Sequence, residues 1–139
     1  MKLIKYYLMC LIIIAAASAQ AQVAVIANKS VSESSISSGK LVDIYCLRAK
    51  TWGNGKEIVP VTIKSDNETT QKFFSALGKS SMEMKKLWMK LQLTGEGQPP
   101  AGVGSDDEVL SKVASTPGAI GFVSSDKVNS SVKVLLTIK

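Results

Sequence analysis

Short apolar runs alternate with amphipathic segments along most of the chain. Residues 22–27 (QVAVIA) are apolar after Gln22, rich in β-branched side chains and too few for a helix. They predict a strand that is buried on both faces. Three further runs, at residues 57–63, 119–123 and 131–138, also predict strands. Pro60 lies inside the first of these three and indicates an edge position or an irregular start, because proline cannot donate to a strand ladder.

Helical spacing of apolar residues separates these strands. It predicts helices that begin near Ser37 or Ser38, Ser65 or Asp66, Ser80 or Ser81, and Ser105, each with a side chain that can cap the first turn. Gly78 is expected to end the second helix. In the third helix an apolar stripe recurs at i, i+3, i+4 and i+7, which we interpret as a core face: Met84, Leu87, Trp88 and Leu91.

The connections carry strong turn signals. Asn54-Gly55 predicts a tight turn with positive φ at both central positions, and Trp52 beside it is expected to pack in the core. The glycine- and proline-rich segment 94–104 is expected to be a loop. The resulting order is β-α-β-α-α-α-β-β, which is typical of an α/β domain with a mostly parallel sheet and helices on both faces.

The first 21 residues have the parts of a secretory signal peptide. Lys2 and Lys5 precede an apolar run, and small residues follow up to Ala21. A membrane anchor is the alternative, but the run is shorter than the roughly 20 apolar residues that span a bilayer. We therefore expect cleavage after Ala21, export to the periplasm or beyond, and a single domain over residues 22–139.

Composition excludes the common catalytic and metal-binding sets. The chain has no histidine, and Cys46 is the one cysteine after residue 21, so it is expected to be a small buried apolar residue. We expect no enzyme activity, no cofactor and no metal. The three acids at residues 106–108 are explained by the dipole of the helix that they begin.

Charge permits an anionic ligand without demanding one. The net charge is +6, and the lysines are scattered apart from Lys85, Lys86 and Lys90, which share one face of a predicted helix. We interpret that face as solvated, and we expect no nucleic-acid partner.

The expected ligand site follows from strand polarity. Ligands of open α/β sheets bind outside the carboxyl ends of the strands, where helix N-termini offer free N–H groups to anions. Two such ends fall at residues 27–28 and 63–64. The candidate ligand-binding residues are Asn28, Ser30, Lys64, Ser65, Asn67, Thr69 and Thr70. The alternative is that Ser65 and Asp66 only cap the helix.

Several segments, in this order, resemble the second lobe of phosphate ABC importer substrate-binding proteins. They are Asn28-Lys-Ser, Leu41-Val-Asp-Ile-Tyr, Thr51-Trp-Gly-Asn-Gly, Ile58-Val-Pro-Val, Phe73-Phe74, Trp88, Thr94-Gly95, Pro99-Pro100 and Ser115-Thr-Pro-Gly-Ala-Ile-Gly-Phe-Val. The resemblance implies the fold of a type II periplasmic binding protein lobe. It also implies a role as a periplasmic solute-binding protein for phosphate or another small oxyanion, with a membrane transporter as partner.

Two features depart from that family. Its members have two lobes, whereas this chain is long enough for one. Their phosphate-gripping Arg and Ser-Gly-Thr correspond here to residues 64–70, with Lys64 for the arginine and Glu68 near the Ser-Gly position. Lysine lacks the bidentate fork of arginine, and Glu68 adds a like charge, so weaker phosphate binding is expected. The alternative function is a non-transport interaction module, an adaptor or sensor partner that keeps the lobe fold.

Overall fold

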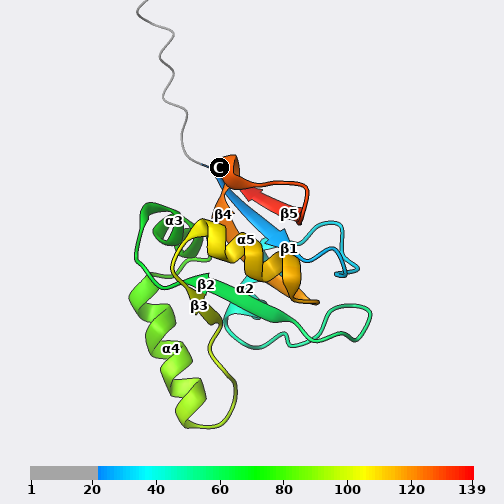
Figure 1. The fold of residues 1–139 in the computed structure, drawn as a ribbon. Helices are drawn as coiled ribbons and strands as arrows, with labels where there is room; N and C mark the ends of the chain where they lie inside the picture. Colours follow the sequence, from blue (N-terminus) through cyan, green and yellow to red (C-terminus); the bar gives the residue numbers. More distant parts are fainter. Residues whose placement is uncertain (1–21) are drawn as a thin grey trace, which may run out of the picture.

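The computed structural model of the chain describes residues 22–139, which contain one five-stranded sheet (Figure 1). The predicted signal segment lies outside the described residues. The strands stand in the order β3–β2–β4–β1–β5. Their bounds are Val23–Ala27 for β1, Val59–Ile63 for β2, Ala101–Val103 for β3, Ala119–Ser124 for β4 and Lys133–Ile138 for β5.

The sheet is mixed but mostly parallel, as the sequence predicted. Strand β2 runs parallel to both β3 and β4, while β1 runs antiparallel to its neighbours β4 and β5. Strand β1 is thus reversed relative to the other four. All five of its residues are buried, in keeping with a strand covered on both faces.

Four α-helices accompany the sheet in the described part of the chain. They are α2 (Ser38–Tyr45), α3 (Glu68–Ala76), α4 (Ser81–Leu93) and α5 (Asp106–Ser115), and a 3₁₀ turn, η2 (Ser125–Lys127), follows β4. The predicted caps at Ser37, Ser80 and Ser105 are confirmed, since each side chain accepts a hydrogen bond from the first turn. Helix α3 begins later than predicted. Its cap is Asn67, because the Asn67 side chain reaches the backbone N–H of Thr70.

The helices form two layers around the sheet. Helix α5 lies against β4, β2 and β1 on one face, in front of the sheet in Figure 1. Helices α2, α3 and α4 lie on the other face. Rings of α2 and α3 contact Phe122 of β4, and Trp88 of α4 contacts Phe74 of α3. Tyr45 of α2 and Phe73 of α3 have ring centroids 4.9 Å apart, and Phe73 stacks on Phe122 at 4.0 Å. These aromatic contacts form the centre of the core.

Buried hydrogen bonds tie this aromatic layer to the backbone. The Tyr45 hydroxyl donates to the carbonyl of Val61 at 2.8 Å, and burial raises the pKa of that hydroxyl well above its usual range. The Trp88 indole N–H donates to the carbonyl of Tyr45 at 2.7 Å. Trp88, Trp52 and Cys46 are all buried, so the prediction that each packs in the core is confirmed.

Two local predictions need correction. Segment 94–104 was expected to be a loop but contains β3, a strand of three residues. The glycines and prolines around this strand interrupt the pattern that would predict it. At the turn, Gly55 has positive φ and Asn54 does not. The backbone N–H of Gly55 donates to the carbonyl of Trp52 and closes the turn, and the backbone N–H of Trp52 donates to the carbonyl of Lys56. This is the hairpin geometry in which a left-handed glycine follows the turn. None of the helices between residues 22 and 139 has the length and hydrophobicity that crossing a bilayer requires.

Candidate functional site

The carboxyl ends of β2 and β3 meet at one edge of the sheet, and the helices that follow them begin there. Ile63 pairs with Val103 in parallel register, and the backbone N–H of Lys64 donates to the carbonyl of Val103 at 2.8 Å. Helix α3 follows β2 and α5 follows β3. The prediction that both helices start at the same edge is therefore confirmed.

The first turn of α3 presents free backbone donors at this edge. Asn67 Oδ1 accepts hydrogen bonds from the backbone N–H and the hydroxyl of Thr70, at 2.9 and 3.0 Å. The backbone N–H groups of Glu68 and Thr69 have no acceptor within residues 22–139. Free N–H groups and the helix dipole together favour an anion at such a position.

A small cavity of about 190 Å³ opens beside this turn, between β2, α3 and α4. Lys64, Ser65 and Thr70 line it, and α4 adds Lys85. Thr62 also lines it, and its hydroxyl is buried with no hydrogen-bond partner among the described residues. A buried hydroxyl without a partner costs on the order of 1–3 kcal/mol, so a polar ligand in the cavity would be favoured.

The position of the Lys64 side chain depends on a glycine in the neighbouring strand. A Cβ atom placed on Gly102 of β3 would lie 2.9 Å from Cγ and 3.2 Å from Cε of Lys64. The aliphatic stem of Lys64 therefore lies across Gly102, and a larger residue there would move the stem. Lys64 is exposed, so its ammonium group remains accessible to solvent.

Carboxylates limit what this edge can bind. Glu68 begins α3 and is exposed. Asp66 lines the cavity and accepts a hydrogen bond from the Ser81 hydroxyl at 2.7 Å. Both lie close to the free N–H groups of α3, and each opposes an anion by like charge. Any anion bound here competes with these two charges.

At the start of α5, the carboxylates of the helix itself accept the hydrogen bonds of nearby backbone N–H groups. Asp106 accepts a hydrogen bond from the backbone N–H of Ser124 at 3.0 Å. Glu108 accepts one from the backbone N–H of Gly104 at 2.8 Å. This assigns two of the three acids to holding α5 against β4 and the β3–α5 turn. The anion-binding potential of this edge therefore lies at α3.

Asn28 and Ser30 lie at the opposite edge of the sheet. Because β1 is antiparallel to β4, Ala27 pairs with Ile120 at the start of β4. The prediction that Asn28 and Ser30 share an edge with Lys64 is wrong, since the length of a five-residue strand, about 15 Å, separates the two groups.

Both residues have structural partners at that opposite edge. Asn28 Nδ2 donates to the carbonyls of Val113 and Ala114, at 2.7 and 3.0 Å, and so satisfies the end of α5. The hydroxyl of Ser30 accepts the backbone N–H of Gly118 at 3.1 Å. These contacts hold the β1–α2 loop to the α5–β4 turn.

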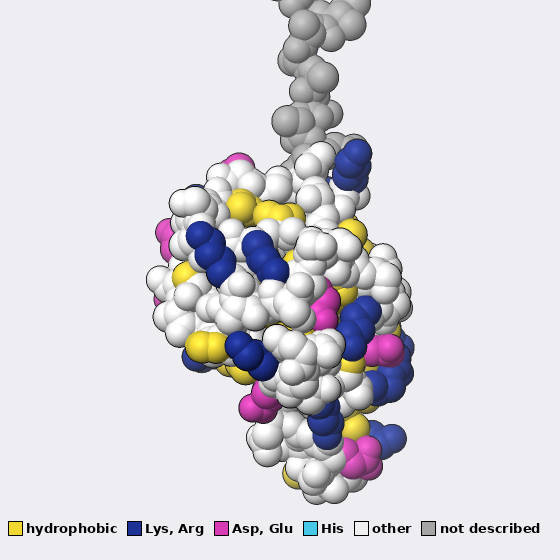
Figure 2. All heavy atoms as spheres, turned by 90° about the vertical axis from the view of Figure 1, so that its right-hand side faces the viewer, with side chains coloured by type: hydrophobic (Ala, Val, Ile, Leu, Met, Phe, Trp, Pro, Cys, Tyr) yellow, Lys and Arg dark blue, Asp and Glu magenta, His cyan; other side chains and the backbone are white. Residues whose placement is uncertain are grey.

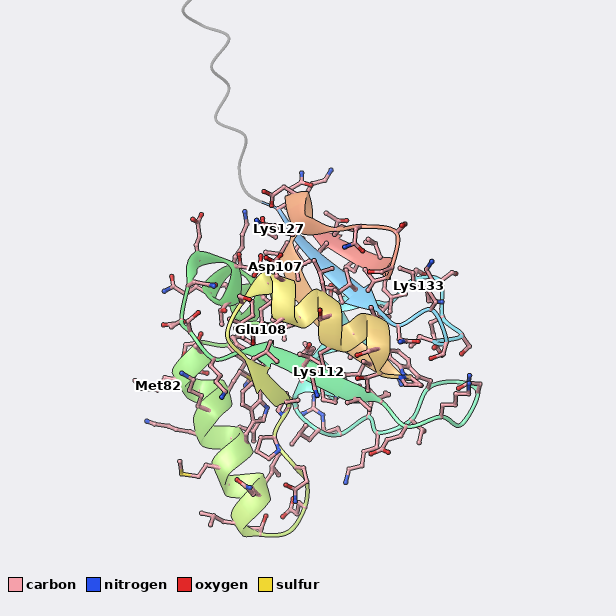
Figure 3. The ribbon with its side chains drawn as sticks, viewed as in Figure 1. Met82, Asp107, Glu108, Lys112, Lys127 and Lys133 are labelled. Atoms are coloured by element: carbon pink, nitrogen blue, oxygen red, sulfur yellow. The ribbon has the colours of Figure 1, made fainter. Side chains whose placement is uncertain are left out.

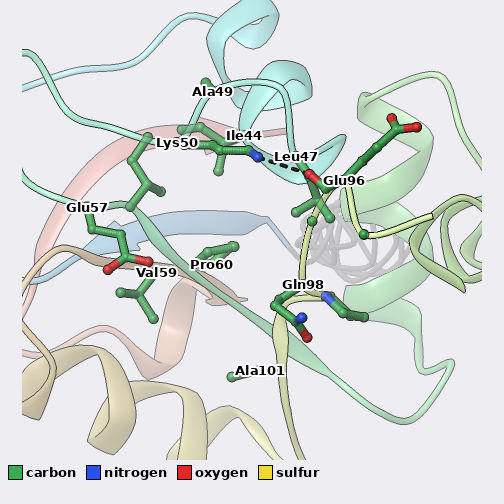
Figure 4. Close-up of a pocket in the computed structure, with 14 residues that line it drawn as sticks. Ile44, Leu47, Ala49, Lys50, Glu57, Val59, Pro60, Glu96, Gln98 and Ala101 are labelled. Atoms are coloured by element: carbon green, nitrogen blue, oxygen red, sulfur yellow. Dashed lines mark hydrogen bonds between the residues drawn. The ribbon is translucent and has the colours of Figure 1, made fainter. Parts of the chain in front are cut away.

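A larger cavity of about 480 Å³ lies at the amino end of β2 (Figure 4). Its wall includes Leu47, Val59 and Pro60, and the loop of residues 95–99 closes one side. Lys50 donates to the carbonyl of Glu96 at 2.9 Å across its rim. The one lysine on this wall is thus already paired, and the cavity shares no residue with the predicted site.

Charge is dispersed on the side of the molecule away from α3 and α4. Figure 2 shows the face formed by the right-hand side of Figure 1, where basic side chains are interspersed with acidic and polar ones. No patch of a single sign stands out on that face. A polyanion such as nucleic acid requires a continuous basic surface, and this face does not offer one.

Comparison with known proteins identifies the architecture. No family model matches the sequence, and no curated protein is significantly similar to it. Among solved structures, an ABC-type phosphate transport receptor from Vibrio cholerae superposes with a TM-score of 0.65 at 21% identity, over 83% of this chain and 46% of that one. A putative phosphate ABC transporter substrate-binding protein from Clostridium perfringens, with bound phosphate, gives 0.68 at 20% identity, over 83% and 45%. PstS from Borrelia burgdorferi gives 0.60 at 17% identity, over 83% and 47%.

This chain has the fold of one lobe of the phosphate ABC transporter substrate-binding proteins. It spans a little under half the length of each of these three chains. The resemblance noted in the sequence is thereby confirmed at the level of the fold. At 17–21% identity the likeness extends to the fold alone.

Sequence reasoning missed two residues that line the small cavity of this lobe. The sequence pattern predicts a solvated helix face for Lys85, and in the structure Lys85 lines the same cavity as Lys64. Thr62 gave no signal beyond its place in a strand, where alternation sets it on the same face as Lys64. Of the seven predicted residues, the structure gathers five between residues 64 and 70 and places the other two at the far edge.

Proposed function

We propose that the chain is an exported solute-binding protein that holds phosphate or another small oxyanion at the start of α3. Export rests on the signal-like residues 1–21, with cleavage after Ala21 leaving one lobe. Binding without catalysis agrees with the transport proteins that share the fold. The observation that carries the proposal is that Lys64 and Lys85 line the same small cavity, next to the first turn of α3 with its free N–H groups.

The proposed contacts divide by chemistry. Lys64 and Lys85 supply positive charge, and the backbone N–H groups of Glu68 and Thr69 donate hydrogen bonds. The hydroxyls of Ser65 and Thr69 lie next to these donors in the chain. The Thr70 hydroxyl already donates to Asn67 Oδ1, so Thr70 shapes the turn, whereas the Nδ2 amide of Asn67 remains as a donor for the ligand. Charge-assisted hydrogen bonds contribute about 1.5–3 kcal/mol each.

An interaction module is the second candidate, and the acids favour it. Asp66 and Glu68 oppose an anion at the same edge. A single lobe also encloses only one side of a ligand, whereas most ligand pockets bury most of the ligand surface. On this alternative the lobe keeps its fold and contacts a transporter or sensor protein.

Titration calorimetry with phosphate, sulfate and small dicarboxylates tests the proposal. Lys64→Ala should weaken binding about tenfold or more, which corresponds to the loss of one charge-assisted contact. Gly102→Ala should also weaken it, because the added methyl group displaces the Lys64 stem. Glu68→Ser should strengthen phosphate binding by removing a like charge.

Lys56→Ala is the matched control, since it removes an exposed lysine from the turn before β2, at the edge of the sheet opposite Lys64. Affinity that ignores Lys64 and Glu68 would place the site elsewhere. No heat with any of these anions would favour the interaction module.

A further inference from the structure

Helix α4 carries an exposed apolar stripe that nothing in the described chain covers. Met82, Met89 and Leu93 are 66%, 62% and 82% exposed, and they are three of the four large apolar side chains exposed in residues 22–139. Figure 3 shows Met82 pointing away from the body of the protein. Exposed apolar side chains gathered on one element, rather than scattered singly, indicate an interaction surface.

The stripe is a narrow seam. At 3.6 residues per turn, the spacing i, i+7 and i+11 keeps the three side chains within about 40° of one another and along about 16 Å of helix. The inner face of the same helix is separate, with Met84 and Trp88 buried against the domain. A seam this narrow is typical of a helix–helix contact, whereas a helix that lies on a membrane buries a broad apolar face.

Lysines flank the seam on both sides. Lys85 lies on one side, with Lys86 and Lys90 on the other, and all three are exposed. In a pair of α4 helices from two copies, either orientation brings lysines of one copy opposite lysines of the other. Like charges at these flanking positions oppose pairing, and opposite charges favour it. Charge therefore argues against a second copy and for an acidic partner.

The position of α4 leaves room for such a partner. The helix projects beyond the sheet, and only its inner face touches the domain (Figure 1). Methionine side chains are flexible and polarizable, and are frequent at surfaces that accept another helix. We propose that the outer face of α4 binds an amphipathic helix of another protein that has apolar residues on its seam and acidic residues beside it.

The methionines make this testable, because those of residues 22–139 are Met82, Met84 and Met89, all on α4. The protein is labelled with ¹³C-methyl methionine and titrated with a designed peptide of four heptads, with leucine at a and d and glutamate at e and g. The methyl signals of Met82 and Met89 should shift to saturation. The signal of Met84, which is 0% exposed, should stay in place as an internal control.

Two sets of variants separate the seam from its flanks. Replacing Met82, Met89 and Leu93 with serine should reduce peptide affinity at least tenfold. The melting temperature should fall only slightly, because the three side chains are exposed and serine is only a weaker helix former. Replacing Lys86 and Lys90 with glutamate should reduce affinity for the glutamate peptide at least tenfold, and Lys85 is kept because it also lines the small cavity. The same change should give binding to a matched peptide with lysine at e and g.

Three results would overturn the proposal. The first is the absence of any Met82 or Met89 shift at millimolar peptide. The second is binding by the lysine-to-glutamate variant to the glutamate peptide with unchanged affinity. The third is that the protein does not bind the peptide but binds phosphatidylglycerol vesicles, or associates with itself in ultracentrifugation, and that the serine variant loses this binding. Anion binding at α3 plays no part in these outcomes, so they stand apart from the proposed function.

Discussion

Replacing Gly118 with alanine should destabilise the protein far more than the same replacement at Gly55. Both glycines have left-handed backbones, with φ of 79° and 83°. A Cβ at Gly55 would meet nothing within 4 Å, whereas one at Gly118 would lie 2.2 Å from the backbone carbonyl oxygen of Glu57. The pair therefore separates the cost of the conformation from the cost of the contact.

The magnitude follows from the contacts of Gly118. An alanine in the left-handed region costs about 1–2 kcal/mol at either position. At Gly118 the backbone must also move away from Glu57. This movement strains the two hydrogen bonds that the Gly118 carbonyl accepts, from the Trp52 indole at 2.9 Å and from the backbone N–H of Val59 at 3.1 Å. Each contributes about 1 kcal/mol, so Gly118→Ala should cost about 3–4 kcal/mol and Gly55→Ala about 1–2 kcal/mol.

Urea denaturation followed by tryptophan fluorescence measures both variants, because Trp52 and Trp88 are buried in the folded protein. The Gly118→Ala midpoint should fall well below that of Gly55→Ala at an unchanged m-value. Equal free energies of unfolding for the two variants would mean that the close approach of Gly118 to Glu57 carries no energy, and the role given to this turn would be wrong.

Two further substitutions test roles that the structure assigns. Trp88→Phe should lower the free energy of unfolding, measured by urea denaturation, by about 1–2 kcal/mol, because the buried carbonyl of Tyr45 loses its donor. A decrease no larger than that caused by a substitution at an exposed residue would contradict this role. Asn28→Ala should destabilise the protein by about 1–3 kcal/mol, because the carbonyls of Val113 and Ala114 lose their hydrogen-bond donor. It should leave the affinity for phosphate, measured by calorimetry, unchanged. A tenfold loss of phosphate affinity in the folded variant would show that Asn28 belongs to the site.

Local signals in the sequence located most of the elements. The helix starts at Ser37, Ser80 and Ser105 could be predicted because a capping side chain acts on the turn directly after it. Strand β3 could not be predicted, because three residues between glycines and prolines have no readable period. Asn67 outcompeted Ser65 and Asp66 as the cap of α3, and sequence alone does not rank adjacent capping residues.

The site was predicted only in part, because strand direction is a property of the whole sheet. Residues 64–70 are continuous with β2, so their place at its carboxyl end followed from the strand itself. Asn28 and Ser30 depended on the direction of β1, which is set by pairing with β4 and β5 from the far end of the chain. Lys85 reaches the cavity through the packing of α4 near α3, which no local pattern reports.

The most direct test of anion binding at α3 is a ¹⁵N-amide NMR titration of the protein with inorganic phosphate. We expect saturable shifts of the amide signals of Glu68 and Thr69, whose N–H groups are free in the described structure. We expect no shift at Asn28 or Ser30, which lie at the other edge of the sheet. Shifts confined to Asn28 and Ser30, or none at Glu68 and Thr69 with phosphate in large excess, would contradict anion binding at α3.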